Sequence, residues 1–343
     1  MEKKENLDLL ENVFYTAAIL LHHIVSHRWG TESDEVLFTD INDPSRAQSK
    51  SMGYKKVLGA CSQALDDGIA YVWLDTCCID KRNQKELTSA INSMYGWYQE
   101  SEVCYVYLHD VSDISGLTGS EWFLRGWTLQ ELIAPRVLKF FAKDWTLLGT
   151  REELRLIHRI TECTGIHPEI LLSGITPYDV SIAQRMHWAA RRTTTEEEDR
   201  AYSLLGLFDI QLPAIYGIKQ KAFKKLRREI VSSSSDKFLF AWKPILNGAV
   251  DFNSPSGITG LLADSPSQYL NVYEIPCEQF YHPFEPNRLA RWECFSLKNG
   301  AVCVTLPIRQ AEDPSVREAL LCCSFDSPQD PPQSQRPLVV YLK

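Results

Sequence analysis

Residues 69–74, IAYVWL, and residues 103–108, VCYVYL, flank a segment with helical spacing, and together they indicate the fold. Both are short runs of β-branched and aromatic residues, a composition typical of strands buried on both faces. Between them, Leu87, Ile91 and Met94 recur at the spacing of one helical face. The segment therefore predicts a strand, a helix and a second strand parallel to the first.

The same alternation extends to both sides of this segment. Residues 17–25 and 137–141 are further strand-like runs, and helical patterns cover residues 54–65 and 123–134, the latter stopped by Pro135. Strands that alternate with helices form parallel sheets with right-handed crossovers, because the crossover helix has to pack back onto the sheet. We therefore predict an α/β fold with a doubly wound parallel sheet flanked by helices.

The ends of the predicted strands indicate where a ligand would bind. In open parallel sheets the ligand crevice lies beyond the carboxyl ends of the strands. This rule selects Ser26, His27, Arg28 and Trp29 after the first strand and Asp75 after the second.

The composition changes along the chain and predicts three segments. Residues 1–150 hold the α/β domain, residues 151–231 form a helical extension, and residues 237–343, with many Pro and Gly, form a small β-rich region. The serine run at residues 232–235 is expected to link the last two segments. The apolar residues 338–342 are expected to be a closing strand or the cut end of a longer chain.

The overall composition excludes several classes of protein. A net charge of -8 disfavours non-specific nucleic-acid binding, which depends on many cationic contacts to phosphate. The 10 cysteines contain no CxxC spacing, so neither a redox pair nor a zinc site is expected. His23 and His27 are four apart, but this spacing binds a metal only on a helix, and no metal site is expected. No window is apolar enough to span a bilayer, so we expect a cytoplasmic protein without a membrane span.

Four blocks of sequence carry a resemblance to a known family. They are HIVSHRWG at residues 23–30, YVWLDTCCIDK at 71–81, RGWTLQELIAP at 125–135 and EDRAYSLLG at 198–206. The first three resemble the signature blocks of the fungal heterokaryon incompatibility (HET) domain, and the fourth resembles the segment that follows them. The resemblance implies non-self recognition and programmed cell death after different hyphae fuse. It implies an effector that acts as a signalling module through self-association, with a second copy or other incompatibility proteins as partners.

The HET domain has been likened to the Toll/interleukin-receptor (TIR) domain, whose fold is a flavodoxin-like parallel sheet. Residues 127–132, WTLQEL, resemble the TIR box in which a Trp precedes a Glu-Leu pair. That Glu is catalytic in the NAD-cleaving TIR enzymes, so the resemblance implies an alternative function, a TIR-like NAD glycohydrolase with Glu131 as the catalytic carboxylate. NAD would be the substrate, and no cofactor is required. A carboxylate beside the ribose stabilises the oxocarbenium-like transition state, and nicotinamide leaves as a neutral molecule without a partner acid.

Two candidate carboxylates each have a second interpretation. Glu131 is either catalytic or a solvated helix residue or an ion-pair partner of Arg125 or Arg136. Asp75 either binds ribose hydroxyls or caps the following helix at its N-terminus.

The other candidates also have alternative roles. Ser26, His27 and Arg28 either bind a phosphate or stabilise a turn. Trp29 and Trp127 either stack on an aromatic base or pack in the core. The candidate NAD-binding residues are Ser26, His27, Arg28, Trp29, Asp75, Arg125 and Trp127.

Overall fold

The chain forms two compact units in the computed structural model, one within residues 1–175 and 192–219 and the other within residues 176–191 and 220–343. The structure describes residues 23–242 apart from 70, 173–175 and 235, then residues 262–270, and beyond these the backbone of strand segments between residues 245 and 342. The segment boundaries at residues 150, 231 and 237 stay predictions.

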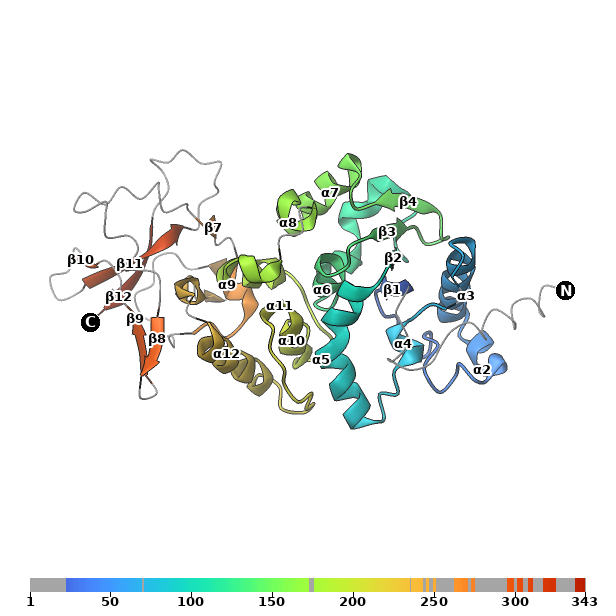
Figure 1. Cartoon of the computed structure of the whole chain (residues 1–343), viewed down its shortest axis with the longest axis horizontal. Coiled ribbons are helices and arrows are strands. Elements are labelled where there is room, and N and C mark those ends of the chain that lie inside the picture. Colours follow the sequence, from blue (N-terminus) through green and yellow to red (C-terminus); the bar gives the residue numbers. More distant parts are fainter. Residues whose placement is uncertain are drawn as a thin grey trace. The chain divides into compact units, whose positions relative to one another are not determined.

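A four-stranded sheet lies at the centre of the first unit (Figure 1). Strands β1 (His23–His27), β2 (Val103–Tyr107) and β3 (Leu138–Phe141) are parallel neighbours in that order. Strand β4 (Leu147–Thr150) pairs antiparallel with β3. The predicted α/β fold is confirmed, whereas β4 was missed because a strand of two leucines followed by glycine has no recognisable strand pattern.

The second predicted strand, residues 69–74, is present only as a short bridge beside β1. Trp73 pairs in parallel with Ile24, and the Val25 N–H donates to the Trp73 carbonyl at 2.9 Å. The bridge stops there because helix α4 (Asp75–Cys78) begins two residues later. In chain order the sheet therefore reads second, first, third and fourth, which is the flavodoxin-like order.

The first strand extends further along the chain than the sequence pattern predicts. Its described residues, His23–His27, run past residue 25, so Ser26 and His27 belong to the strand and not to the loop after it. Residues 17–22 lie outside the described residues. A polar Ser26 is tolerated in a buried strand because its hydroxyl forms hydrogen bonds within the protein interior.

Two of the predicted helices are confirmed. Residues 54–65 lie within α3 (Ser51–Asp66), and residues 87–98 lie within α5 (Gln84–Glu100). Asn83 caps α5, because its side chain accepts hydrogen bonds from the Lys85 and Glu86 N–H groups. A further short helix, α2 (Pro44–Ser49), precedes α3.

The predicted helix over residues 123–134 is wrong in its first part. A 3-10 turn, η2 (Glu121–Leu124), comes first, and the helix α6 covers only Thr128–Ile133. Between them the backbone pairs with a distant segment: the Gly126 N–H donates to the Thr193 carbonyl at 2.8 Å, and the Thr193 N–H donates to the Leu124 carbonyl at 2.7 Å. A Cβ on Gly126 would lie 2.5 Å from Thr194, so only glycine allows this close approach.

Helices cover both faces of the sheet (Figure 1). On one face, Val57 and Ala60 of α3 pack in a buried cluster with Val25 and Tyr105. On the other face, α6 contacts β1 and α5. Successive strand residues point to opposite faces, so Ser26 points away from the α3 face that Val25 occupies. This alternation brings Ser26 to the same face as α6.

Shorter helices complete the first unit. Their bounds are η1 (Ile114–Gly119), α7 (Leu154–Thr164), α8 (Pro168–Leu172), α10 (Asp199–Tyr202) and α11 (Leu205–Phe208). Helix α11 packs on α5, with Gly206 directly against the Tyr95 ring. This contact keeps residues 192–219 within the first unit.

The second unit is mixed helical and β-rich. Its helices and 3-10 turns are η3 (Pro177–Asp179), α9 (Ile182–Ala189), α12 (Lys221–Ser233), η4 (Lys237–Phe240) and η5 (Pro266–Tyr269). Its strands are β5 (Ile245–Leu246), β6 (Ala249–Val250), β7 (Tyr273–Glu274), β8 (Phe295–Lys298), β9 (Ala301–Val304), β10 (Ile308–Gln310), β11 (Arg317–Ser324) and β12 (Pro337–Leu342). The predicted β-rich character is confirmed, and the apolar residues 338–342 lie in strand β12. Among the described helices, none has the length and apolarity needed to cross a bilayer.

Candidate functional site

A pocket of about 720 Å³ opens at the carboxyl end of β1, where the strand-end rule places a ligand. Its lining includes seven of the eight candidate residues, namely His27, Arg28, Trp29, Asp75, Arg125, Trp127 and Glu131. The eighth, Ser26, is buried and touches the pocket residue Glu131. Residues chosen from three separate parts of the sequence therefore meet at one site.

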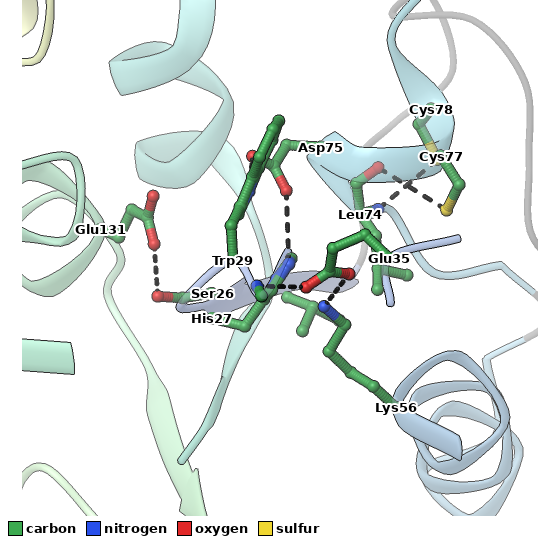
Figure 2. A network of polar contacts seen from close by, with 12 residues as sticks. Ser26, His27, Trp29, Glu35, Lys56, Leu74, Asp75, Cys77, Cys78 and Glu131 are labelled. Carbon is green, nitrogen blue, oxygen red and sulfur yellow. Dashed lines mark hydrogen bonds and ion pairs between the residues drawn. The ribbon is translucent and has the colours of Figure 1, made fainter. Parts of the chain in front are cut away.

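Glu131 lies on α6 and is buried, with 7% of its surface exposed. The Ser26 hydroxyl donates to Glu131 Oε2 at 2.5 Å, and the Trp122 indole N–H donates to the same hydroxyl at 2.8 Å (Figure 2). Ser26 therefore orients the carboxyl group. The Ser26 hydroxyl therefore already has both a donor and an acceptor, and its role as a phosphate ligand stays a prediction.

Burial raises the pKa of Glu131 to about 8, and the negative charge of Asp75 adds to the increase. The hydrogen bond from Ser26 lowers the pKa and offsets only part of this increase. At neutral pH the Glu131 side chain is therefore mostly protonated.

The structure does not place Glu131 in either of its alternative roles. The side chain is not solvated, and within the described part of the chain no ion pair joins it to Arg125 or Arg136. Arg125 instead donates to the Thr195 hydroxyl at 3.0 Å.

Asp75 holds Trp29 at the pocket wall. Its Oδ2 accepts a hydrogen bond from the Trp29 indole N–H at 2.8 Å, as Figure 2 shows. Among the described residues, no donor reaches the second oxygen, Oδ1, although that atom is buried. The N-cap of α4 is Leu74, without a side-chain cap, so the capping interpretation of Asp75 is wrong. Burial raises the pKa of the Asp75 carboxyl, and the nearby charges of Lys81 and Lys56 oppose this increase.

His27 lies beside Asp75 and is buried. Its Nε2 lies 3.8 Å from Asp75 Oδ1, and neither ring nitrogen has a hydrogen-bond partner among the described residues. Burial lowers the pKa of His27 well below its usual value, so the imidazole is neutral. One N–H donor and one acceptor nitrogen of His27 are therefore unsatisfied.

Arg28 lies at the rim of the pocket and forms an ion pair with Glu121 at 2.9 Å. Both side chains are well exposed, so the pair contributes little stability. Glu121, His109 and Asp110 bring potential ligand atoms within 4.8 Å of one another. Glu121 is already paired with Arg28, and Asp110 accepts hydrogen bonds from Ser120 and from the Glu121 N–H, so this group does not point to a metal site.

The opposite wall comes from a segment that the sequence analysis did not place at the site. The Trp127 indole N–H donates to Asp199 Oδ2 at 3.0 Å, and the Tyr216 hydroxyl donates to Asp199 Oδ1 at 2.8 Å. Burial raises the pKa of Asp199. Asp199 is part of the fourth block, residues 198–206, and that resemblance was the available signal.

A buried ion pair supports the loop after β1. Lys56 of α3 donates to Glu35 Oε2 at 2.5 Å, and the Gly30 N–H donates to Glu35 Oε1 at 2.8 Å (Figure 2). Both charged side chains are 4% exposed. Burial lowers the pKa of Lys56, and the charge of Glu35 opposes that change. The pair keeps the loop that carries Trp29 close to α3.

Lys81 is a further pocket residue without an assigned role. Its ammonium lies 3.0 Å from the centre of the Trp29 ring, and the nitrogen is buried. It follows α4 in the loop that leads to α5.

Comparison with known proteins gives two matches. Residues 22–119 match the family described as heterokaryon incompatibility protein (HET). The chain is 47% identical over 220 residues to the vegetative incompatibility protein HET-E-1 of Podospora anserina, a match that covers 60% of this chain and 16% of that protein's length. No solved structure matches the chain significantly. The matched region, residues 22–119, is thus a HET domain, and it supplies Arg28, Trp29 and Asp75 to the lining of the pocket.

Proposed function

We propose that this chain acts in heterokaryon incompatibility, and that its HET domain triggers cell death as a TIR-like NAD glycohydrolase. The name of the relative supports the first part, because that protein is a vegetative incompatibility protein. The observation that carries the second part is the buried Glu131 carboxyl group, held by Ser26 at the wall of a pocket of about 720 Å³. A pocket of this volume suits a ligand of nucleotide size.

The proposed reaction breaks the bond between the ribose C1′ and the nicotinamide nitrogen. The bonding electron pair goes to the nitrogen, which makes nicotinamide neutral, and water then adds to C1′ and loses one proton. Ionised Glu131 stabilises the positive charge that develops on the ribose. Bound NAD carries a cationic nicotinamide ring, and this charge favours the ionised form of Glu131 over the protonated form that burial favours.

The surrounding side chains suit the rest of the ligand. Asp75 Oδ1 and the His27 ring are unsatisfied and would exchange hydrogen bonds with ribose hydroxyls. The indole rings of Trp29 and Trp127 are each oriented by a carboxylate and offer flat apolar surfaces for the two bases of NAD.

The test compares the full chain with its Glu131→Gln variant. The purified proteins are incubated with NAD, and both are expressed in yeast while intracellular NAD and viability are followed. We expect the substitution to lower the rate of NAD cleavage by about 100- to 1000-fold, the size typical of losing one transition-state stabiliser, and to prevent both NAD loss and death.

Glu162→Gln is the matched control, because Glu162 is exposed on α7 and outside the pocket lining. This control should cleave NAD at the rate of the unmodified chain. Death with unchanged NAD, in the chain and in Glu131→Gln alike, would contradict the enzymatic proposal. That outcome would favour a signalling module that acts through self-association with its own copies or with other incompatibility proteins.

A further inference from the structure

The cations around the pocket differ in what they contact. Arg28 is paired with Glu121, Lys56 is paired with Glu35, and Arg125 donates to Thr195. Lys81 contrasts with them, because its ammonium has no hydrogen-bond acceptor among the residues that the structure describes. Its stabilising contact is the face of the Trp29 ring.

A buried ammonium group without an acceptor costs free energy. Each of its three N–H groups has lost water, and a ring face replaces only part of that hydration. Asp75, the first of the acidic groups that act on Lys81, keeps its nearer contacts with Trp29 and His27. An anionic group of a ligand in the pocket would therefore accept a charged hydrogen bond that no described residue accepts from Lys81.

The groups near Lys81 indicate which kind of anionic ligand would fit the pocket. Asp75 Oδ1 and the His27 ring nitrogens, both unsatisfied, suit sugar hydroxyls, and the Trp29 ring suits a flat base. Inorganic phosphate would leave all of these groups unused. The set fits a ligand that joins a base, a sugar and a phosphate.

We propose that Lys81 is the phosphate-binding residue of this pocket and that it selects phosphorylated nucleotides over nucleosides. The inference rests on the proposed function for the ligand class and adds the residue that contacts the phosphate. We prefer Lys81 to Ser26, His27 and Arg28 as the phosphate-binding group. The Ser26 hydroxyl donates to Glu131, the His27 imidazole is neutral, and the Arg28 guanidinium is paired with Glu121.

Calorimetric titration of the full chain tests this assignment with four probes: ADP-ribose, AMP, adenosine and sodium pyrophosphate. Lys81→Met keeps the apolar stem against Trp29 and removes the charge. We expect Lys81→Met to lower the affinity for ADP-ribose and AMP by about 10- to 100-fold, the effect of losing one charged hydrogen bond. The affinity for adenosine should change by less than about twofold. Lys81→Arg retains the charge and should remain within about fivefold of the unmodified chain for every probe.

Lys85→Met is the control, because Lys85 is an exposed residue in the first turn of α5 and outside the pocket lining. The proposal is overturned if the unmodified chain binds neither nucleotide, if Lys81→Met leaves ADP-ribose affinity unchanged, or if it weakens adenosine equally. If pyrophosphate binds as tightly as ADP-ribose, the proposal that the ligand is a nucleotide is wrong. Binding is measured without cleavage, so a chain that shows Lys81-dependent affinity but cleaves no NAD refutes the glycohydrolase and leaves this assignment standing.

Discussion

Trp29 and Trp127 each line the pocket and each donate a hydrogen bond to a carboxylate, but the two carboxylates differ in whether their second oxygen has a donor. Trp29 donates to Asp75, and Trp127 donates to Asp199, at 2.8 and 3.0 Å. Asp199 uses its second oxygen to accept from Tyr216, whereas the second oxygen of Asp75 has no donor among the described residues. Both oxygens of Asp199 are therefore satisfied within the protein, whereas the Asp75 side, where Lys81 lies on the Trp29 indole, keeps an acceptor oxygen without a donor among the described residues.

Glu131 and Asp75 interact electrostatically. The charge of Asp75 contributes to the rise in the Glu131 pKa, after burial. Such an arrangement is costly for folding, because ionising one carboxylate opposes ionising the other. The comparison therefore predicts that the side with Asp75 and Glu131 limits stability and that the side with Asp199 supports it.

The largest expected effect is on stability. The folded pKa of Glu131 is about 8 and its unfolded value is about 4.5, so folding takes up a proton and the free energy of unfolding falls as pH rises from about 4.5 to about 8. Glu131→Gln removes this dependence. We expect the variant to be more stable than the unmodified chain by roughly 4 kcal/mol at pH 7.5 and equally stable near pH 4.5.

Denaturant unfolding of both proteins across this pH range measures the difference. The Glu162→Gln control should follow the unmodified chain. A stability difference between Glu131→Gln and the unmodified chain that stays constant with pH would show that Glu131 is not protonated by folding.

A matched pair of substitutions tests the two walls against each other. In Asp75→Asn the amide still accepts from Trp29, but the free acceptor beside His27 is lost, so ADP-ribose affinity should fall by about 10- to 100-fold. In Asp199→Asn both contacts can persist, because the Tyr216 hydroxyl can accept as well as donate. ADP-ribose affinity should then change by less than about threefold. Equal losses in the two variants would abolish the distinction between the walls.

The smallest expected effect is a shift in a pH profile. If ionised Glu131 is the working form, kcat/KM for NAD cleavage rises with pH toward an apparent pKa of about 8 in the free protein. Asp75→Asn removes a negative charge near Glu131 and should lower this apparent pKa by roughly one unit or less, since burial remains the larger cause. An unchanged pH profile would show that the charge of Asp75 does not affect the ionisation of Glu131.

The sequence predicted which residues lie at the pocket more fully than it predicted the contacts between them. The strand-end rule and the resemblance located Trp29, Asp75 and Glu131, because strand ends and short motifs are local properties of a sequence. Lys81 and Asp199 were missed as site residues, although both lie in the quoted blocks, because neither follows a predicted strand.

Apolar periodicity is sufficient to predict the alternation of strands and helices, since it reports which face of each segment is buried. It could not predict that residues 124–126 pair with Thr193, which delays the start of the predicted helix and leads the chain back to the pocket through Asp199. The contacts of Ser26 with Glu131, of Arg28 with Glu121 and of Lys81 with Trp29 could be seen only in the folded chain. Hydrogen-bond partners and the degree of burial depend on segments far apart in the chain, and these two properties set the charge of every group at the site.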